Sequence, residues 1–216
     1  MLISIDLKGG LGNQLFMIFT TFAHSMQYDK QVIFRYQLKL GDRYTYWDSF
    51  LNTLKKYTTY NIDNNISNSE LVSCNRYMES NFFFTPIPNL DKNTMLDGYF
   101  QSFKYFDNYK NEILSIIDFQ NKQQHVRNKY SRYFEGKQTV SIHFRLGDYK
   151  KIRYFHPIMN YEYYENSLLY IVNKIKQPMR ILYFCEKEDN LYVESKISIM
   201  KCKIPELEFV KVDDTI

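Results

Sequence analysis

The opening of the chain constrains its fold more than any other feature. Residues 2–7 form an apolar run with the length of a buried β-strand, and residues 8–14 are rich in glycine. Apolar residues then recur at helical spacing from 15 to 26, and residues 31–36 are again strand-like. A strand, a glycine-rich loop, a helix and a strand in this order predict a βαβ unit with a right-handed crossover, as in nucleotide-binding folds.

The glycine-rich loop has the composition of an anion site. Gly9, Gly10 and Gly12 lack the spacing of a dinucleotide-binding fingerprint, and the Lys-Ser/Thr ending of a Walker loop is missing. Glycines before a helix still permit close backbone approach and leave N–H groups at the helix N-terminus, where anions are favoured. Asn13 and Gln14 add side-chain amides there. A plain tight turn with a helix cap is the alternative interpretation.

A second polar motif lies at residues 139–149. Apolar and polar residues alternate over its first half, which predicts a strand, and the chain turns at Gly147. His143 and Arg145 are two residues apart, so we expect them on one face at the carboxyl end of the strand, where open α/β sheets bind ligands. Arginine offers a planar fork of donors suited to phosphate, and histidine can donate to the same group. The alternative is that Arg145 and Asp148 only pair to hold the turn.

The remaining elements continue the alternation of strands and helices. In the first half of the chain we expect a strand and two helices, at 95–101, from 104 and at 123–133. In the second half we expect a helix, a strand, a helix and a strand, at 161–176, 180–184, 188–200 and 207–212. The pattern weakens from 41 to 93, where an aromatic cluster surrounds Trp47 and residues 82–88 predict an edge strand or a loop. This region either lines an acceptor pocket or packs in the core.

This order of elements predicts an α/β fold with two Rossmann-like domains. The polar segment 135–137 is the expected boundary, which gives an N-terminal, acceptor-side domain of residues 1–136 and a C-terminal, donor-binding domain of residues 137–216. A complete doubly wound domain usually has more strands than the second half supplies before Ile216. We therefore expect the second domain to be incomplete, either truncated or naturally short.

Composition argues against several classes of function. The net charge is only +4 and the basic residues are dispersed, which argues against a nucleic-acid partner but suits an anionic small molecule or a lipid surface. Cys74, Cys185 and Cys202 have no metal-ligand spacing and predict reduced thiols. We find no signal peptide and no apolar run near the ~20 residues that span a bilayer. We expect a cytoplasmic protein, with peripheral association at the cytosolic face of a membrane as an alternative.

Three segments together resemble the α-1,2-fucosyltransferase family, glycosyltransferase family 11. They read Gly-Gly-Leu-Gly-Asn-Gln-Leu-Phe at 9–16, Leu-Asp-Gly-Tyr-Phe-Gln-Ser-Phe-Lys-Tyr-Phe at 96–106, and His-Phe-Arg-Leu-Gly-Asp-Tyr at 143–149. Residues 156–164 are also similar to the segment that follows the third motif in the family. The resemblance covers nearly the whole chain, but an Asn-Ser-x-Phe-Ser-Trp-Trp motif, into which members continue, is absent.

The resemblance implies a GT-B-like architecture, with a donor between two Rossmann-like domains. It also implies transfer of L-fucose from GDP-β-L-fucose to a glycan hydroxyl, with inversion and without a metal. Arg145 would bind the diphosphate, His143 would help to position it, and Asp148 would shape the loop. The implied catalytic residues are Arg145, Asn13 and Asp148, and the implied donor-binding residues are His143, Arg145, Gly10, Gly12, Asn13 and Gln14.

The chemistry of the reaction explains why no cofactor is expected. The departing diphosphate gathers negative charge, which a fixed arginine and backbone N–H groups stabilise more in the transition state than in the ground state. These groups would replace Mg²⁺, since the sequence has no Asp-x-Asp after a strand and we interpret Asp213-Asp214 as a solvated end. The general base is left open between Asp148, His156 and Glu186.

Two departures from the family pattern keep alternatives open. Leu146 stands where many members have a second arginine, and Cys185-Glu186-Lys187 stands where the family usually shows Ser-Asp-Asp, which affects donor recognition. A transferase of the same fold that uses another nucleotide sugar is therefore one alternative. A non-catalytic, truncated module that binds a glycan or takes part in an assembly is another.

Overall fold

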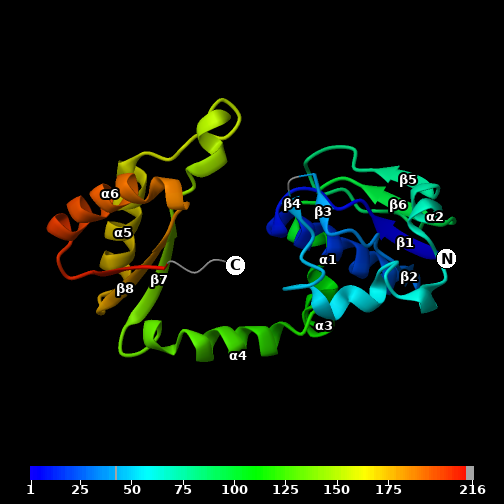
Figure 1. Ribbon diagram of the computed structural model, residues 1–216, viewed down its shortest axis with the longest axis horizontal. Helices are drawn as coiled ribbons and strands as arrows, with labels where there is room; N and C mark the ends of the chain where they lie inside the picture. The colour runs from blue at the N-terminus through cyan, green and yellow to red at the C-terminus, as the bar shows by residue number, and fades with distance from the viewer. Residues whose placement is uncertain (42, 213–216) are drawn as a thin grey trace. The chain divides into compact units, whose positions relative to one another are not determined.

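The computed structural model describes residues 1–41 and 43–212, and the chain divides into two compact units (Figure 1). The first unit is Met1–Gln124 and the second is His125–Ile216. Their boundary falls within helix α4 (Phe119–Lys129), whereas the segment expected as the boundary, 135–137, lies in the second unit directly before its first strand. We describe each unit by itself.

The first unit contains a four-stranded parallel sheet with the strand order β2-β1-β6-β5. Its strands are β1 (Leu2–Ile5), β2 (Gln31–Val32), β5 (Asn75–Met78) and β6 (Thr94–Asp97). Its α-helices include α1 (Leu11–Tyr28), α2 (Asn68–Val72) and α3 (Lys110–Ile116). A hairpin pairs β3 (Lys39–Leu40) with β4 (Arg43–Tyr44). Short 3₁₀ helices are η1 (Asn52–Tyr57), η2 (Ile62–Asn64), η3 (Phe103–Tyr105) and η4 (Asp107–Tyr109).

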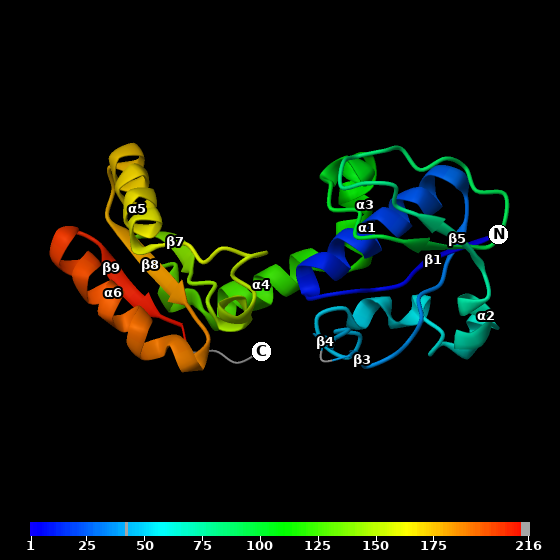
Figure 2. The same cartoon turned by 90° about the horizontal axis from the view of Figure 1, so that it is seen from above.

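Helices cover both faces of this sheet, with α1 and α3 on one side and α2 on the other (Figure 2). Successive residues of a strand face opposite sides. Ile3 and Ile5 therefore pack in a cluster with Phe22 of α1, whereas Leu2 packs with Leu71 of α2. The continuous apolar run at the start of the chain is the expected composition of such a strand, which is buried on both faces.

The predicted βαβ opening is confirmed as β1, α1 and the parallel strand β2. The second strand is shorter than predicted, because it pairs only at Gln31–Val32 and continues as a single bridge between Phe34 and Thr58. The aromatic cluster is also present: Trp47 is buried and lies 5.6 Å from the Phe34 ring. Residues 82–88 form a loop, which was one of the two predictions for that run.

The second unit contains a three-stranded parallel sheet in the order β7-β8-β9. Its strands are β7 (Gln138–His143), β8 (Met179–Phe184) and β9 (Glu208–Lys211). The helices between them are α5 (Tyr161–Ile175) and α6 (Asn190–Lys203). The 3₁₀ turns are η5 (Ser131–Tyr133), η6 (Gly147–Lys151) and η7 (Lys187–Asp189). The predicted strand–helix alternation is confirmed, with boundaries that shift by a few residues.

Local signals explain where helix α5 begins and which face it buries. Asn160 precedes the helix, and its side chain accepts a 3.1 Å hydrogen bond from the Tyr163 backbone amide. Tyr164 and Leu168, four residues apart, are buried against the sheet. The Tyr164 ring lies 4.4 Å from the ring of Phe144, which follows β7. This packing fixes one face of the strand and leaves the alternate residues, including His143, exposed.

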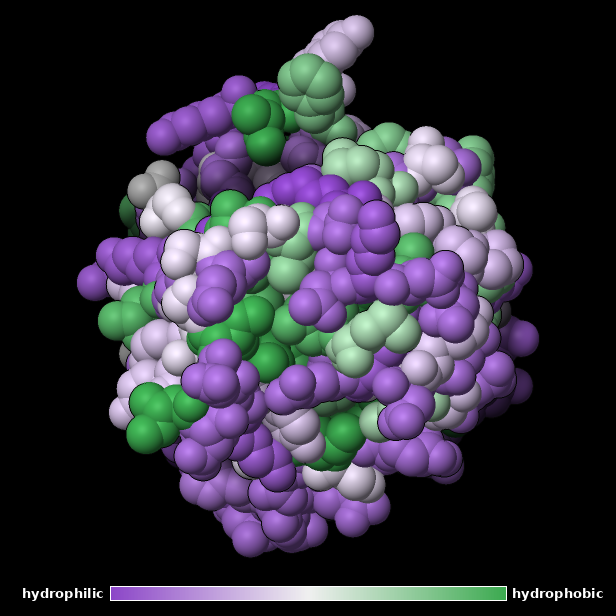
Figure 3. Space-filling model, turned by 90° about the vertical axis from the view of Figure 1, so that its right-hand side faces the viewer, coloured by the Kyte–Doolittle hydropathy of each residue, from purple (hydrophilic) through white to green (hydrophobic). Residues whose placement is uncertain are grey.

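The described residues contain no helix that is long and apolar enough to span a membrane. The face in Figure 3 is mostly hydrophilic, with its apolar residues in small, separate patches.

Candidate functional site

Two loops carry the residues predicted to form the site, and each follows the first strand of its unit. In the first unit, Gly9 has a φ angle of +68°, in the left-handed region that favours glycine. A Cβ atom at Gly9 would overlap Nδ2 of Asn13, so the loop folds directly against this side chain. Helix α1 begins at Leu11, and Gly10 before it has an extended backbone and offers no side-chain cap. Gly10 therefore has no side-chain acceptor that could occupy the N–H groups in the first turn of α1.

Asn13 and Gln14 have different environments although they are adjacent. Asn13 is half-buried, and its Oδ1 accepts a 2.7 Å hydrogen bond from Nε2 of Gln101. Gln14 is fully buried, and its amide donates to the carbonyl oxygens of Gly9 at 3.0 Å and of Tyr44 at 2.7 Å. Gln14 thus joins the glycine loop to the β3-β4 hairpin from inside the unit. This placement does not fit the donor contact predicted for Gln14, because its amide hydrogens are already used for structure.

A network of five charged side chains lies at the carboxyl ends of β1 and β6. Asp6 pairs with Arg76 at 2.9 Å and with Arg35 at 3.5 Å. Asp97 pairs with Arg76 at 3.1 Å and also with Lys8. The hydrogen bond from Lys8, together with the charges of Lys8 and Arg76, lowers the pKa of the Asp97 carboxyl. This network was not predicted from the sequence; the signal for it is an aspartate at the end of an apolar strand, since Asp97 ends β6 and Asp6 directly follows β1.

In the second unit, Arg145 lies just beyond the carboxyl end of β7. Its Nη2 lies 3.0 Å from Oδ1 of Asp148, and its guanidinium carbon lies 4.6 Å from the centre of the Tyr149 ring. The ion pair that was the alternative interpretation is therefore present. The Arg145 side chain is still 40% exposed, so the pair does not exclude contact with an anion. His143, the last residue of β7, is exposed.

Contacts with Asp189 connect the loop that carries Arg145 to the start of helix α6. The backbone amide of Gly147 donates a 3.0 Å hydrogen bond to Oδ2 of Asp189, which is only 2% exposed. The other oxygen of Asp189 pairs with Lys150, and this hydrogen bond raises the pKa of Lys150. Gly147 has a φ of +28°, and a Cβ atom there would lie 2.9 Å from Cγ of Glu186. Asp189 is thus a structural residue of the site that sequence analysis did not identify.

Leu146 has a structural explanation in this chain. It is 4% exposed and packs in the core of the second unit with Phe144. Leu146 lies beyond the end of β7, and its backbone is not extended, with φ −111° and ψ −84°, so its burial follows from the turn after the strand. Its apolar side chain contributes to this core, and the motif has the single guanidinium of Arg145.

The three candidates for a general base all lie around this loop. Asp148 pairs with Arg145, and Glu186 lies against Gly147. The ring of His156 stacks on the Tyr149 ring at 4.6 Å and 19°. The second unit thus brings together three groups able to accept a proton at the carboxyl end of one strand.

Comparison with known proteins adds evidence about the fold. No protein-family model and no curated protein matches the sequence. A solved structure of NodZ alpha-1,6-fucosyltransferase soaked with GDP-fucose has a TM-score of 0.52 and 9% identity, and the match covers 99% of this chain and 78% of that chain. The fold is GT-B-like. The fucosyltransferase NodZ from Bradyrhizobium matches with a TM-score of 0.49 and 9% identity, over 97% of this chain and 78% of that chain.

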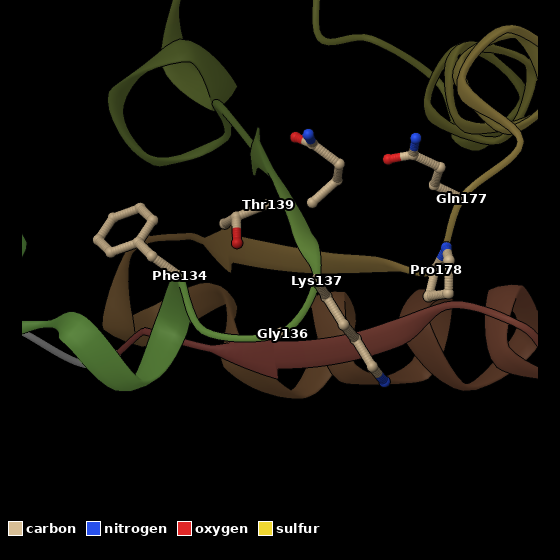
Figure 4. A pocket seen from close by; sticks show the side chains of 7 residues that line it. Phe134, Gly136, Lys137, Thr139, Gln177 and Pro178 are labelled. Atoms are coloured by element: carbon tan, nitrogen blue, oxygen red, sulfur yellow. The ribbon is translucent and has the colours of Figure 1, made fainter.

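One depression in the second unit lies at the opposite edge of the sheet from Arg145. It has a volume of about 500 Å³ and lies at the amino ends of β7 and β8, between Gly136 and Thr139 on one side and Pro178 on the other. Figure 4 shows Lys137 and Gln177 extending in opposite directions, so these two side chains do not converge. Ligand sites of α/β sheets lie at carboxyl ends and have convergent polar groups. We therefore do not assign this depression to the site.

Among residues 1–41 and 43–212, no group of three or more His, Cys, Asp or Glu side chains is arranged to hold a metal ion. Asp213 and Asp214 lie outside these residues.

Proposed function

We propose that this protein is a glycosyltransferase that moves L-fucose from GDP-β-L-fucose to a hydroxyl group of a glycan. The observation that carries the proposal is the half-exposed guanidinium of Arg145 beside the carboxyl end of a parallel strand, on a loop that Asp189 holds in place. A pyrophosphate offers the planar pairs of oxygens that arginine binds best. The solved structure of similar fold is described as a fucosyltransferase soaked with GDP-fucose, which supports this choice of donor.

The proposed roles of the residues follow from their positions. Arg145 binds the diphosphate and stabilises its developing charge, His143 helps to position it, and Asp148 orients the guanidinium. In the first unit, the proposed ligand-binding groups are the backbone N–H groups of Gly10 and Gly12 and the side-chain amide of Asn13, for a phosphate or an acceptor. The first unit then serves the acceptor and the second unit the donor. No metal takes part in this scheme, because the guanidinium and the N–H groups neutralise the leaving group.

The proposal extends to the linkage and the stereochemistry of the transfer product. The three sequence motifs resemble α-1,2-fucosyltransferases, which supports an α-1,2 linkage with inversion, whereas the structure of similar fold is described as an α-1,6-fucosyltransferase. Both groups use the same donor chemistry at different acceptor hydroxyls. Analysis of the product linkage by NMR after incubation with GDP-fucose and a glycan acceptor separates the two. An α-1,6 product would overturn the α-1,2 assignment and leave the donor proposal intact.

Another nucleotide sugar is the second candidate donor. Cys185 follows β8, and its thiol donates to Oδ1 of Asn190 at 3.3 Å. This segment stands where the family shows Ser-Asp-Asp, so its contacts to a base or ribose differ from the family pattern. A ligand that binds only the native state raises the melting temperature. A thermal-shift panel of GDP-, UDP- and dTDP-sugars therefore tests the donor, and stabilisation by GDP-fucose alone supports the first proposal.

A non-catalytic module that binds glycans would show a different pattern. It would bind glycans without stabilisation by any nucleotide sugar and without release of GDP from GDP-fucose. The proposed location is cytoplasmic, with the cytosolic face of a membrane as the alternative. Phe82 and Phe83 are 89% and 81% exposed, which supports the alternative, since aromatic rings insert readily at lipid surfaces. Co-sedimentation with anionic vesicles that Phe82→Ser abolishes would establish it, and absence of binding to vesicles would exclude it.

A further inference from the structure

The second of the three sequence motifs, residues 96–106, has no part in the proposed function. Its first two residues end strand β6, and Gln101 follows shortly after at the carboxyl edge of the sheet. Gln101 is exposed, and its Nε2 donates the 2.7 Å hydrogen bond to Oδ1 of Asn13 across 88 positions of sequence. The motif therefore directly contacts a residue proposed to bind a ligand.

The carboxylate of Glu79 holds the chain just before Gln101. Its Oε2 accepts hydrogen bonds from the backbone amides of Tyr99 at 2.8 Å and Phe100 at 3.0 Å. Gly98 packs directly against this side chain, since an added Cβ there would lie 2.3 Å from Cβ of Glu79. A carboxylate that accepts from two backbone amides forms charge-assisted hydrogen bonds, which are stronger than neutral ones. The turn that leads to Gln101 is therefore well restrained.

The residue before Gln101 has an unfavourable backbone conformation. Phe100 has a φ of +48°, in the left-handed region that is costly for a residue with a Cβ atom. Its side chain is 1% exposed, and its ring lies 5.3 Å from the ring of Tyr105. The backbone amide of Ser102 also donates to its carbonyl oxygen at 2.7 Å. Such conformations persist where packing and hydrogen bonds impose them, and they are concentrated at functional sites.

The hydrogen bond from Gln101 determines which atom of Asn13 remains available to a ligand. A side-chain amide has an oxygen that accepts and a nitrogen that donates. Because Nε2 of Gln101 donates to Oδ1, the reversed orientation of the Asn13 amide would bring two donors together. Nδ2 is thereby held against the glycine loop, where a Cβ at Gly9 would lie 2.4 Å from it. Nδ2 has no hydrogen-bond partner among the residues that the structure describes.

The surroundings of Nδ2 favour an anion. Helix α1 has 18 residues, and its N-terminus has neither a side-chain cap nor an acidic residue in the first turn. Added Cβ atoms at Gly10 and Gly12 would meet no atom within 4 Å, so there is space beside the first turn. Phosphate oxygens only accept hydrogen bonds, and the dipole of the helix favours their charge. An acceptor hydroxyl can also accept from Nδ2, but it lacks this charge.

We propose that Gln101 is a positioning residue, which holds the Asn13 side chain so that Nδ2 donates to a phosphate oxygen of the nucleotide sugar. Gln101 itself does not touch the ligand. Glu79 and the buried ring of Phe100 hold the turn, the turn places Gln101, and Gln101 orients Asn13. The inference rests on the proposed function, and it assigns Asn13 to the phosphate instead of the acceptor.

A double-mutant cycle between Gln101 and Asn13 tests this role. Gln101→Met keeps the length of the side chain and removes the hydrogen bond, so the Kd for GDP-fucose in calorimetry should rise about 3–10-fold. Its melting temperature should equal that of the wild type, because Gln101 is exposed. In an Asn13→Ala background, Gln101→Met should have no further effect on binding. A merely structural role of Gln101 would weaken binding equally in both backgrounds.

Gln101→Glu reverses the hydrogen bond. A carboxylate only accepts, so it should draw Nδ2 of Asn13 toward itself and weaken binding more than Gln101→Met does. Gln27→Glu is the matched control for the added charge, since Gln27 is exposed near the other end of α1, and it should bind like the wild type. Affinity in Gln101→Glu that equals that of the wild type would contradict the proposal.

The side-chain amide resonance of Asn13 in ¹H–¹⁵N NMR spectra tests the orientation without GDP-fucose. This resonance, identified by its loss in Asn13→Ala, should shift in Gln101→Met, and inorganic pyrophosphate should move it more in the wild type than in Gln101→Met. The proposal is overturned if Gln101→Met leaves the resonance or the GDP-fucose affinity of the wild type unchanged, if it weakens binding equally in the Asn13→Ala background, or if pyrophosphate does not move the resonance. A response to pyrophosphate without binding of GDP-fucose would overturn the proposed donor and support the role of Gln101.

Discussion

The Gly147 backbone amide and the buried Asp189 carboxylate are joined by a 3.0 Å hydrogen bond across 42 positions of sequence. The same carboxylate pairs with Lys150. The Asp189 side chain therefore binds both Gly147 and Lys150, which lie at the two ends of the first turn after Arg145. A buried carboxylate with two donors restrains a loop more than an exposed ion pair does, because solvent does not compete for it. The orientation of the Arg145 loop therefore depends on a residue that touches no predicted substrate.

Asp189→Ala should lower the free energy of unfolding by about 1–3 kcal/mol, because it leaves the Gly147 amide and Lys150 without their acceptor. It should also weaken binding of GDP-fucose by loosening the loop. Glu188→Gln is the control, since Glu188 is 66% exposed and lies 3.6 Å from Lys150, and it should change stability by less than about 0.5 kcal/mol. Urea unfolding measures both variants. Equal stability of Asp189→Ala and the wild type would show that the loop is held by other contacts.

Gly9 and Gly12 should respond oppositely to the same substitution. Gly9→Ala should destabilise the protein by more than about 1 kcal/mol, because its φ is +68° and its Cβ would overlap Asn13. Gly12 lies in the first turn of α1, where an added Cβ meets no atom within 4 Å. Gly12→Ala should be neutral or stabilising by up to about 1 kcal/mol. Thermal unfolding of both variants provides the test, and a Gly9→Ala protein as stable as the wild type would contradict the loop geometry.

Stability should fall at acidic pH through the network around Asp97. Lys8 and Arg76 lower the pKa of Asp97 in the folded protein below the ~3.9 of an unfolded aspartate. The folded state then binds fewer protons, so the contribution is present above about pH 4 and is lost as pH falls through the folded pKa. Both cations are 40% exposed, which limits the contribution to about 1 kcal/mol.

The variant Asp97→Asn isolates this effect. The difference in unfolding free energy between wild type and Asp97→Asn should be largest at neutral pH and should shrink as pH drops below about 4. Urea unfolding at several pH values between about 3 and 7 measures it. A difference that stays constant over this range would show that the charge of Asp97 has no part in stability.

Much of the fold could be predicted from the sequence, because strong apolar periodicity marks the elements that build each core. The run at 2–7, the helix faces of α1 and α5, and strands β7 and β8 all bury residues at the expected spacing. Strand β5 escaped prediction because it is an edge strand with exposed polar residues, so it lacks an alternating pattern. The two-residue length of β2 (Gln31–Val32) could not be predicted either, because it depends on where the neighbouring segments of the fold end.

The candidate site was predictable only in part. The alternation of apolar and polar residues up to Phe144 made His143 and Arg145 identifiable as candidates, whereas Leu146 is buried by the turn that follows the strand. The burial of Gln14 could not be predicted, because its partner Tyr44 comes from a hairpin that no local pattern brings to the loop. Asp189 lies 42 positions after Gly147, and its partner there is a backbone amide. Every residue except proline has such an amide, so the amino-acid types could not indicate this contact.

Titration of GDP-fucose by isothermal calorimetry into the wild type, Arg145→Ala and Arg132→Ala tests the central claim most directly. Arg132 is an exposed arginine of the second unit that is outside the site and pairs with Tyr133, so Arg132→Ala is a control for loss of charge. Loss of a charged hydrogen bond to phosphate of about 1.5–3 kcal/mol predicts binding about 10–100-fold weaker in Arg145→Ala alone, with an unchanged melting temperature. GDP-fucose affinity that is equal in Arg145→Ala and the wild type, or no binding by the wild type, would contradict the account.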